Sequence, residues 1–258
     1  KCSYHFIHFQ FAPDGMPSMQ GGKVGPDIEI DDDLTGQKIS VPRKSVFNAH
    51  KTLGHHKAPA GNSRTQCQVL HQHGLTTATR VLSSPLTPTE AHMYYHAIWN
   101  AQMRYVLPQC VLSPKQLHFI ENKPLQAFVA KRGYGRTMAL AVRYGPQQLG
   151  GAGFIQLETL QGEGQVLNFL KMLRTNCAIS SLARCALSWG QLQAGIGSPI
   201  LMVPKLPLPH HEQRFIASMR AFLGSIDAQL EVDQDFVPER QRSHDFYLMD
   251  LAICSGVF

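Results

Sequence analysis

Cysteine and histidine residues give this chain its first candidate metal-binding chemistry. Cys67 and His71 are four residues apart, so they would share one face of a helix, and His73 follows them closely. No Cys-x-x-Cys or Cys-x-x-His pair completes a set of four ligands, and neighbours such as His55 and His56 usually point apart. The sequence therefore favours packed or surface histidines, and we expect no metal site in this chain.

Three consecutive aspartates, Asp31 to Asp33, could also hold divalent ions, as the paired aspartates of a polymerase do. A polymerase pair follows an aromatic residue in a tight hairpin, whereas here Ile28-Glu29-Ile30 precedes the run and Leu34-Thr35-Gly36 follows it. Like-charge repulsion and turn-forming residues predict a solvent-exposed hairpin tip. A serine nucleophile is not indicated either, because the sequence contains no Gly-x-Ser-x-Gly motif.

Composition limits the class of protein. The chain has 258 residues, enough for one large domain or two smaller ones, and its 43% hydrophobic content is typical of a globular protein. Its formal charge of +6 suits a polyanionic partner such as nucleic acid. Six scattered cysteines fit a reducing compartment, and the sequence shows no signal peptide and no apolar run of ~20 residues. We therefore expect an intracellular protein, nuclear or cytoplasmic, that binds no membrane.

The sequence predicts a β-rich segment followed by a helical region, and these two parts would position the candidate residues. Residues 1–57 alternate in polarity and contain turn signals, which predicts a small antiparallel β-rich segment. Residues 58–150 carry strong helix signals, and residues 151–258 continue as a helical extension. The expected fold class is therefore α+β, with these three regions in order along the chain.

Local signals mark the helices of the second region. Asn62 or Ser63 can cap a helix that runs to about Leu82, and capping boxes with proline at the first helical position begin at Thr87 and Ser113. Each of these two later helices has an expected apolar stripe. The stripes are Met93, Ala97, Ile98 and Ala101 in the first, and Leu117, Ile120, Leu125 and Phe128 in the second.

A glycine-rich joint at 144–154 leads from the second region into the extension. Apolar-striped helices are expected at about 155–175, 178–194 and 210–228. Between the last two, the proline-rich segment 199–209 is expected to be a linker or a surface brace.

The order of these segments resembles the reverse transcriptases of non-LTR (LINE-type) retrotransposons, downstream of their catalytic aspartates. Lys1-Cys2 on a strand, a hairpin insertion, Lys51-Thr52-Leu53-Gly54 and a helical bundle match the end of the palm and the start of the thumb. Arg143-Tyr144-Gly145-Pro146 and Gly150-Gly151-Ala152-Gly153-Phe154 match the turn that follows the thumb, with Ala152 where leucine is usual. The matching segments span most of the chain and are sparse after about residue 195.

This resemblance implies a function for the parent protein. It would be an RNA-directed DNA polymerase whose Mg²⁺ ions are held by aspartates upstream of this sequence, so both ends of the chain would be cuts and the chain alone would be inactive. By the same resemblance, Lys1 would donate a proton to the pyrophosphate leaving group in the intact parent. Lys51, Thr52, Leu53 and Gly54 would form the primer grip.

The helical region would then be a thumb that binds the RNA/DNA template–primer duplex through its phosphates. The implied contacts are basic residues of the helical region: Lys115, Lys123, Lys131, Arg132, Arg136 and Arg143. Arg132 and Arg136 are expected to be exposed. No small-molecule substrate is expected for this chain alone. The alternative is a non-enzymatic helical adaptor with a small β-domain that binds protein rather than nucleic acid.

Overall fold

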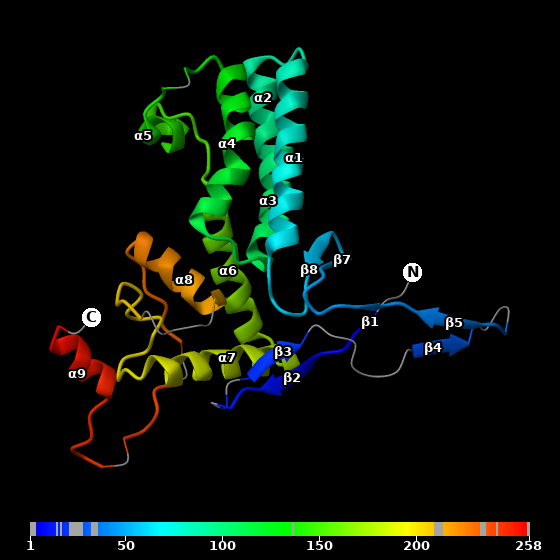
Figure 1. Cartoon of the computed structure of the whole chain (residues 1–258). Helices are drawn as coiled ribbons and strands as arrows, with labels where there is room; N and C mark the ends of the chain where they lie inside the picture. Colours follow the sequence, from blue (N-terminus) through cyan, green and yellow to red (C-terminus); the bar gives the residue numbers. More distant parts are fainter. Residues whose placement is uncertain are drawn as a thin grey trace. The chain divides into compact units, whose positions relative to one another are not determined.

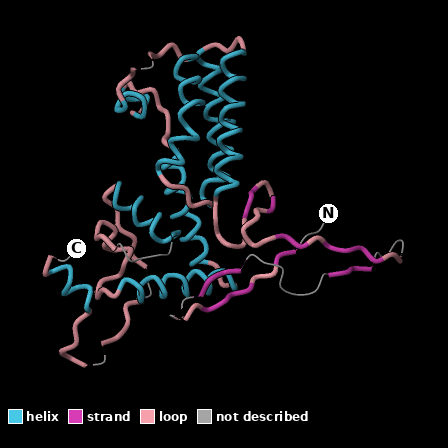
Figure 2. Tube along the Cα trace, in the orientation of Figure 1, coloured by secondary structure: helices cyan, strands magenta, loops and turns pink. Residues whose placement is uncertain are grey.

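The computed structural model is mixed α+β, as predicted, with short strands followed by helices (Figures 1 and 2). It describes residues 4–13, 15, 17–20, 28–31, 36–135, 137–208, 214–232, 236–240 and 242–256. The chain divides into two compact units, Lys1–Arg80 and Val81–Phe258.

The strands of the first unit form separate two-stranded pairs among the described residues. β2 (His8–Phe11) pairs with β3 (Pro17–Gln20), β4 (Ile28–Asp31) with β5 (Lys38–Val41), and β7 (His50–Thr52) with β8 (His55–Lys57), all antiparallel. β1 (Tyr4–His5) pairs in parallel with β6 (Arg43–Lys44). The predicted antiparallel hairpins are confirmed, and the single parallel pair was not predicted.

The hairpin around the acidic run has the expected form. Asp31 lies opposite Lys38, and the neighbouring side chains of Glu29 and Lys38 form an exposed ion pair of 3.4 Å. Asp32 and Asp33, which were expected at the tip, lie outside the described residues.

Apolar side chains of the first unit are largely exposed. Its buried apolar residues include Val41, Val46 and Ala58. The exposed ones include Phe6, Ile7, Phe9, Phe11, Ile28, Ile30 and Ile39. Because an isolated two-stranded hairpin is marginal in water, each strand pair by itself contributes little to the stability of this unit.

α1 (Arg64–Ser83) runs across the boundary between the two units. The sequence predicted a helix from Asn62 or Ser63 to about Leu82, and this prediction is confirmed within two residues. At the start of this helix, the backbone N–H of Cys67 donates a hydrogen bond of 2.9 Å to the backbone carbonyl of Ser63.

Both predicted capping boxes are present in the second unit. Thr87 caps α2 (Pro88–Tyr94) together with Glu90, and Ser113 caps α4 (Pro114–Lys131) together with Gln116. In each box the hydroxyl accepts a backbone N–H and the longer side chain accepts the N–H of the cap residue, so both helix starts are determined locally. Gly133, with φ +78°, follows the end of α4.

α2 continues without a break through a π-helical segment η1 (Tyr95–Asn100), α3 (Ala101–Val106) and the 3₁₀ turn η2 (Leu107–Gln109). The predicted apolar stripe of this helix is wrong: Met93, Ala97, Ile98 and Ala101 are exposed. The buried positions are four residues apart: Ala91, Tyr95, Trp99, Met103 and Leu107.

The π segment explains this change of face. In a regular α-helix, residues spaced by four drift around the axis by about 40° at each step. A π turn holds more residues, so it turns less per residue and cancels part of the drift. The helix can therefore bury a row with a constant spacing of four, which the 3.6-residue pattern does not predict. The stripe predicted for α4, with Leu117, Ile120, Leu125 and Phe128 buried, is confirmed.

The glycine-rich joint is a compact, hydrogen-bonded turn region. It connects α5 (Leu140–Tyr144), η3 (Gln147–Leu149) and α6 (Leu157–Arg174). The carbonyl of Gly145 accepts the N–H of Gly153 at 2.9 Å, and Ala152 donates to the carbonyl of Val142 at 2.7 Å. A side chain at Gly151 would lie 2.1 Å from the Gly145 carbonyl oxygen, so the two backbone segments approach too closely for any residue but glycine.

The extension consists of α6, α7 (Ala178–Ala194), α8 (Arg214–Ser225) and α9 (Leu248–Cys254). α6 contacts both α7 and α8, and Figure 1 shows these three helices together below α4. The predictions of helices at 155–175 and 178–194 are confirmed. Within the predicted 210–228 segment the described helix is α8, and residues 210–213 lie outside the described residues.

The proline-rich segment, which the structure describes over residues 199–208, is not a linker, and this corrects one of the two alternatives expected for it. Ile200, Leu201 and Leu208 are buried in the core of the extension, and the buried guanidinium of Arg220 donates to the carbonyls of Ile200, Val203 and Leu206. Burial lowers the pKa of Arg220 from its ordinary value.

Candidate functional site

The hairpin predicted as the primer grip is present. Lys51 and Thr52 end β7, and Thr52 lies opposite His55, so Leu53 and Gly54 form a two-residue turn. Both have positive φ, +48° and +87°, which is the geometry of a type I′ turn. Leucine in this conformation costs about 1–2 kcal/mol, and the side chain of Leu53 is 84% exposed at the tip. The hairpin is confirmed, and its role at a primer end stays a prediction.

Two of the predicted phosphate contacts are available on the surface. Lys115 and Lys123 are exposed and stand eight residues apart on α4, about 12 Å along its axis. Both could reach a phosphate backbone without changing the packing of the bundle.

Lys131 and Arg132 make contacts within the fold. The ammonium of Lys131 donates to the carbonyl of Ser84 at 2.7 Å. Arg132 is only partly exposed: Nη1 donates to the carbonyl of Ala152, and the guanidinium stacks on Tyr134 at 5.2 Å and Phe154 at 5.5 Å. The expectation that Arg132 is exposed is therefore wrong, because this side chain attaches the end of α4 to the glycine-rich joint.

Of the three further predicted site residues, Arg143, Arg136 and Lys1, the structure describes only Arg143. Arg143 is partly buried in α5, where it donates to the carbonyl of Met138 at 3.5 Å and lines a cavity with Glu121. Arg136 and Lys1 lie outside the described residues.

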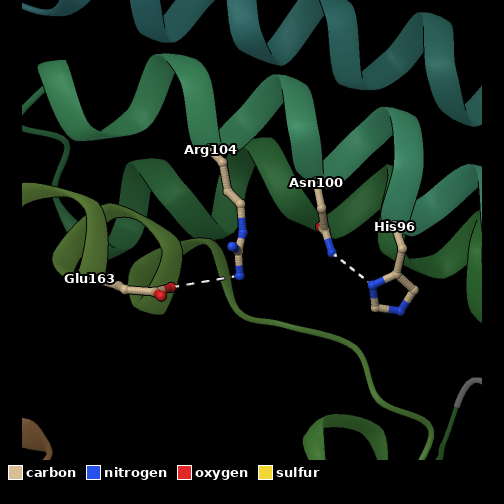
Figure 3. Close-up of polar contacts among 4 residues, drawn as sticks. All are labelled: His96, Asn100, Arg104 and Glu163. Carbon is tan, nitrogen blue, oxygen red and sulfur yellow. Dashed lines mark hydrogen bonds and ion pairs between the residues drawn. The ribbon is translucent and has the colours of Figure 1, made fainter. Parts of the chain in front are cut away.

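The structure adds a row of polar side chains that the sequence analysis missed: His92, His96, Asn100 and Arg104, here called the polar row. The rings of His92 and His96 meet edge to face at 4.3 Å, and the Asn100 amide lies 3.4 Å from Nδ1 of His96. Arg104 forms a 3.7 Å ion pair with Glu163 of α6 (Figure 3). Figure 3 shows the side chains of His96, Asn100 and Arg104 projecting from one side of the helix.

A spacing of four residues from position 92 to position 104 was the available signal for this row. This spacing by itself does not predict the row, because the π segment that keeps four successive turns in line has no local signature comparable to a capping box.

The polar row has the electrostatics of a hydrogen-bonding surface rather than of a metal site. Burial lowers the pKa values of His92 and His96, the charge of Arg132 lowers both further, and His92 also lowers the pKa of His96, so the environment favours the neutral form of each ring. The buried oxygen Oδ1 of Asn100 has no hydrogen-bond partner among the described residues. The Arg104 side chain is 55% exposed. A ligand with both donors and acceptors would suit this surface.

No three His, Cys, Asp or Glu side chains converge to hold a metal within the described residues. Burial raises the pKa of the Cys67 thiol, which disfavours the thiolate that zinc requires. His55 is buried, and burial and the charge of Lys57 lower its pKa. The absence of zinc stays a prediction.

Comparison with known proteins does not assign a family: no family model, no curated protein and no solved structure matches this chain. In the part of the chain that the structure describes, every helix is too short or too polar to cross a lipid bilayer.

Proposed function

We propose that this chain is the end of the palm, the primer grip, the thumb and a helical extension of a reverse transcriptase of the non-LTR retrotransposon class. Its role in that enzyme is to bind the template–primer duplex. In the cell, such a protein would act in the nucleus or cytoplasm, where its nucleic-acid partners are found.

The observation that carries this proposal is the type I′ hairpin at Leu53-Gly54, followed within ten residues by the start of α1 at Arg64. Leu53 adopts a costly backbone conformation and holds an apolar side chain that is 84% exposed at the tip of the hairpin. Contact with a bound partner would explain an exposed leucine at this position, and the partner that we propose is the primer terminus.

The exposed apolar faces of the strand pairs support the same proposal. Phe9 and Phe11 of β2 lie opposite Met19 and Pro17 of β3, and both phenylalanines are exposed. Further strands of a palm would cover such a face. The catalytic aspartates and their Mg²⁺ ions belong to that upstream part of the enzyme, so this chain alone polymerises nothing, and Lys1 acts only in the intact enzyme.

Salt-dependent binding of an RNA/DNA hybrid duplex tests the proposal. Reversing the charge of the two exposed lysines, in a Lys115→Glu/Lys123→Glu variant, should weaken binding several-fold and lower the log–log salt slope by roughly two units. The matched control is Lys171→Glu/Arg174→Glu, which changes the net charge equally at exposed positions of α6.

Equal weakening by the two double variants would mean that only net charge matters, and it would remove the evidence for a thumb surface. Binding that neither variant changes, at low and at high salt, would contradict the proposal outright.

The hairpin has its own test. Leu53→Asn keeps a residue that tolerates positive φ and removes the apolar tip, so it should stabilise the hairpin by up to about 1 kcal/mol. The variant should also lose the preference for a duplex with a recessed 3′ primer end over a blunt duplex. An unchanged preference would separate Leu53 from primer binding.

A specific observation favours the adaptor alternative for the extension. α7 exposes Ile179, Leu182, Trp189 and Leu192 in addition to its buried face, so the helix is apolar on more than one side. An apolar protein interface of this kind gives binding that varies little with salt, which distinguishes it from duplex binding.

A further inference from the structure

One face of α7 is both apolar and exposed. Six apolar side chains lie on it, here called the α7 stripe: Ile179, Leu182, Cys185, Ala186, Trp189 and Leu192. The four large side chains are between 55% and 69% exposed. The opposite face of the helix, with Ala183, Leu187 and Ala194, is buried in the core of the extension. The α7 stripe is therefore a second apolar face, which the described residues leave in solvent.

The spacing of the α7 stripe is that of a seam between two helices. Four of its members, from Leu182 to Leu192, follow one another at intervals of three, four and three residues. This is the heptad pattern that a pair of packed helices buries. Arg184 is the only charged residue in the sequence of α7, and it donates to a backbone carbonyl of α6. The seam itself is uncharged, so it does not repel a copy of itself.

The α7 stripe is also self-complementary. Read from either end, it has two large side chains, two small ones and two large ones, at intervals of three, three, one, three and three residues. A two-fold interface needs such symmetry, because residue i of one copy contacts residue j of the other and j contacts i. In an antiparallel pair with the axis between the two small residues, Leu182 lies opposite Trp189 of the second copy. Ile179 then lies opposite Leu192 of the second copy.

The apolar area of the α7 stripe suits a weak pair. Each of the four large side chains exposes on the order of 100 Å², which gives roughly 800 Å² for two copies. The smaller residues between them bring this total toward the ~1,000 Å² of a specific interface, but not to the ~1,600 Å² of a stable one. We therefore expect a dissociation constant of about 100 µM.

We propose that the α7 stripe binds a second copy of this chain, in an antiparallel α7–α7 pair. This pairing does not depend on duplex binding, and salt separates the two. Duplex binding weakens as the salt concentration rises. Two copies that each carry a formal charge of +6 repel each other at low salt, so their association should become tighter at high salt.

Sedimentation equilibrium of the whole chain, from about 5 to 500 µM, tests the proposal. The mean mass should rise from one chain toward two and should not exceed two, because a two-fold pair is closed. Leu182→Glu and Trp189→Arg each place a charge in the seam and should weaken association at least about tenfold. Leu149→Glu is the matched control, since this side chain is 85% exposed and lies outside α7, and it should leave association unchanged.

A mixture of the two seam variants tests the antiparallel register. When Leu182→Glu pairs with Trp189→Arg, one contact joins the new glutamate to the new arginine, and the other keeps the original leucine and tryptophan. A parallel pair would offer neither contact, because each position would face its own copy. The equimolar mixture should therefore associate several-fold more tightly than either variant alone.

Several outcomes overturn the proposal. A chain that stays monomeric up to about 500 µM would mean that another part of the chain, or another protein, covers the α7 stripe. Growth beyond two chains would exclude a closed pair. Association that the seam variants leave unchanged, or that Leu149→Glu weakens equally, would place the contact elsewhere. A mixture that associates no better than its components would exclude the antiparallel register.

Discussion

The hydroxyl of Tyr95 forms two hydrogen bonds with one residue, Ile155, which is sixty positions away in the sequence. It accepts the backbone N–H of Ile155 and donates to its carbonyl, each at 3.0 Å. The ring meets Phe128 and Phe154 edge to face, at 5.2 and 4.8 Å. One side chain of η1 therefore connects the π segment, α4 and the chain that leads into α6.

Tyr95→Phe should destabilise the protein by about 2–3 kcal/mol, because both backbone groups of Ile155 lose their partner while the ring stays packed. Chemical denaturation measures the loss as a change in the free energy of unfolding. Tyr94→Phe is the control, since its ring also contacts Phe128 and the described residues give its hydroxyl no hydrogen bond. Equal effects of the two substitutions would show that the Tyr95 bonds contribute nothing.

Arg132 should behave as a structural residue. Arg132→Lys keeps the charge and removes the planar group that stacks on Tyr134 and Phe154, so it should cost about 1–2 kcal/mol of stability. Thermal melting and duplex binding should be measured on the same variant. A variant of unchanged stability that binds the duplex more weakly would restore Arg132 as a phosphate contact.

The glycine-rich joint should tolerate a methyl group at one glycine and not at its neighbour. At Gly151 an added Cβ would clash with the Gly145 carbonyl, so Gly151→Ala should cost about 3 kcal/mol or more. At Gly150 the added atom meets open space and only the positive φ of 81° is strained, which costs about 1–2 kcal/mol. The free energies of unfolding of the two variants check this order, and a reversed order would contradict the joint described here.

The raised pKa of Glu121 predicts how stability depends on pH. Between pH 4.5, the ordinary pKa of the group, and about 7, the folded state keeps a proton that the unfolded state has released. The folded state therefore loses stability as the pH rises through this window, by up to about 3 kcal/mol, and the loss is complete above pH 7.

Unfolding measured from pH 4.5 to 8 in parallel for the parent and Glu121→Gln isolates this effect, because the histidines contribute equally to both. The stability of the parent relative to the variant should fall across the window. A constant difference between the two profiles would mean that the Glu121 pKa is not raised.

The sequence by itself determined where α2 and α4 begin, because local chemistry determines these two boundaries. The Thr87 and Ser113 boxes satisfy backbone groups within three residues, and Gly133 supplies a positive φ where α4 ends. The hairpin at Leu53-Gly54 was expected only from the family resemblance, because leucine does not favour the positive φ that this turn requires. The α+β class and the order of strands and helices followed from these local signals.

Only the tertiary structure decided which faces are buried and what the charged residues do. The π segment places Tyr95 and Trp99 on the buried face of the continuous helix α2–η1–α3, and it aligns His92 and His96. The residue types in this segment do not predict a π turn. Arg132 became a bridge because Ala152 and Phe154, twenty and twenty-two positions away in the sequence, lie against it in the fold. Glu121 became a buried acceptor because the N-terminus of α6 packs on α4. Such contacts depend on the path of the whole chain, and no window of sequence contains that information.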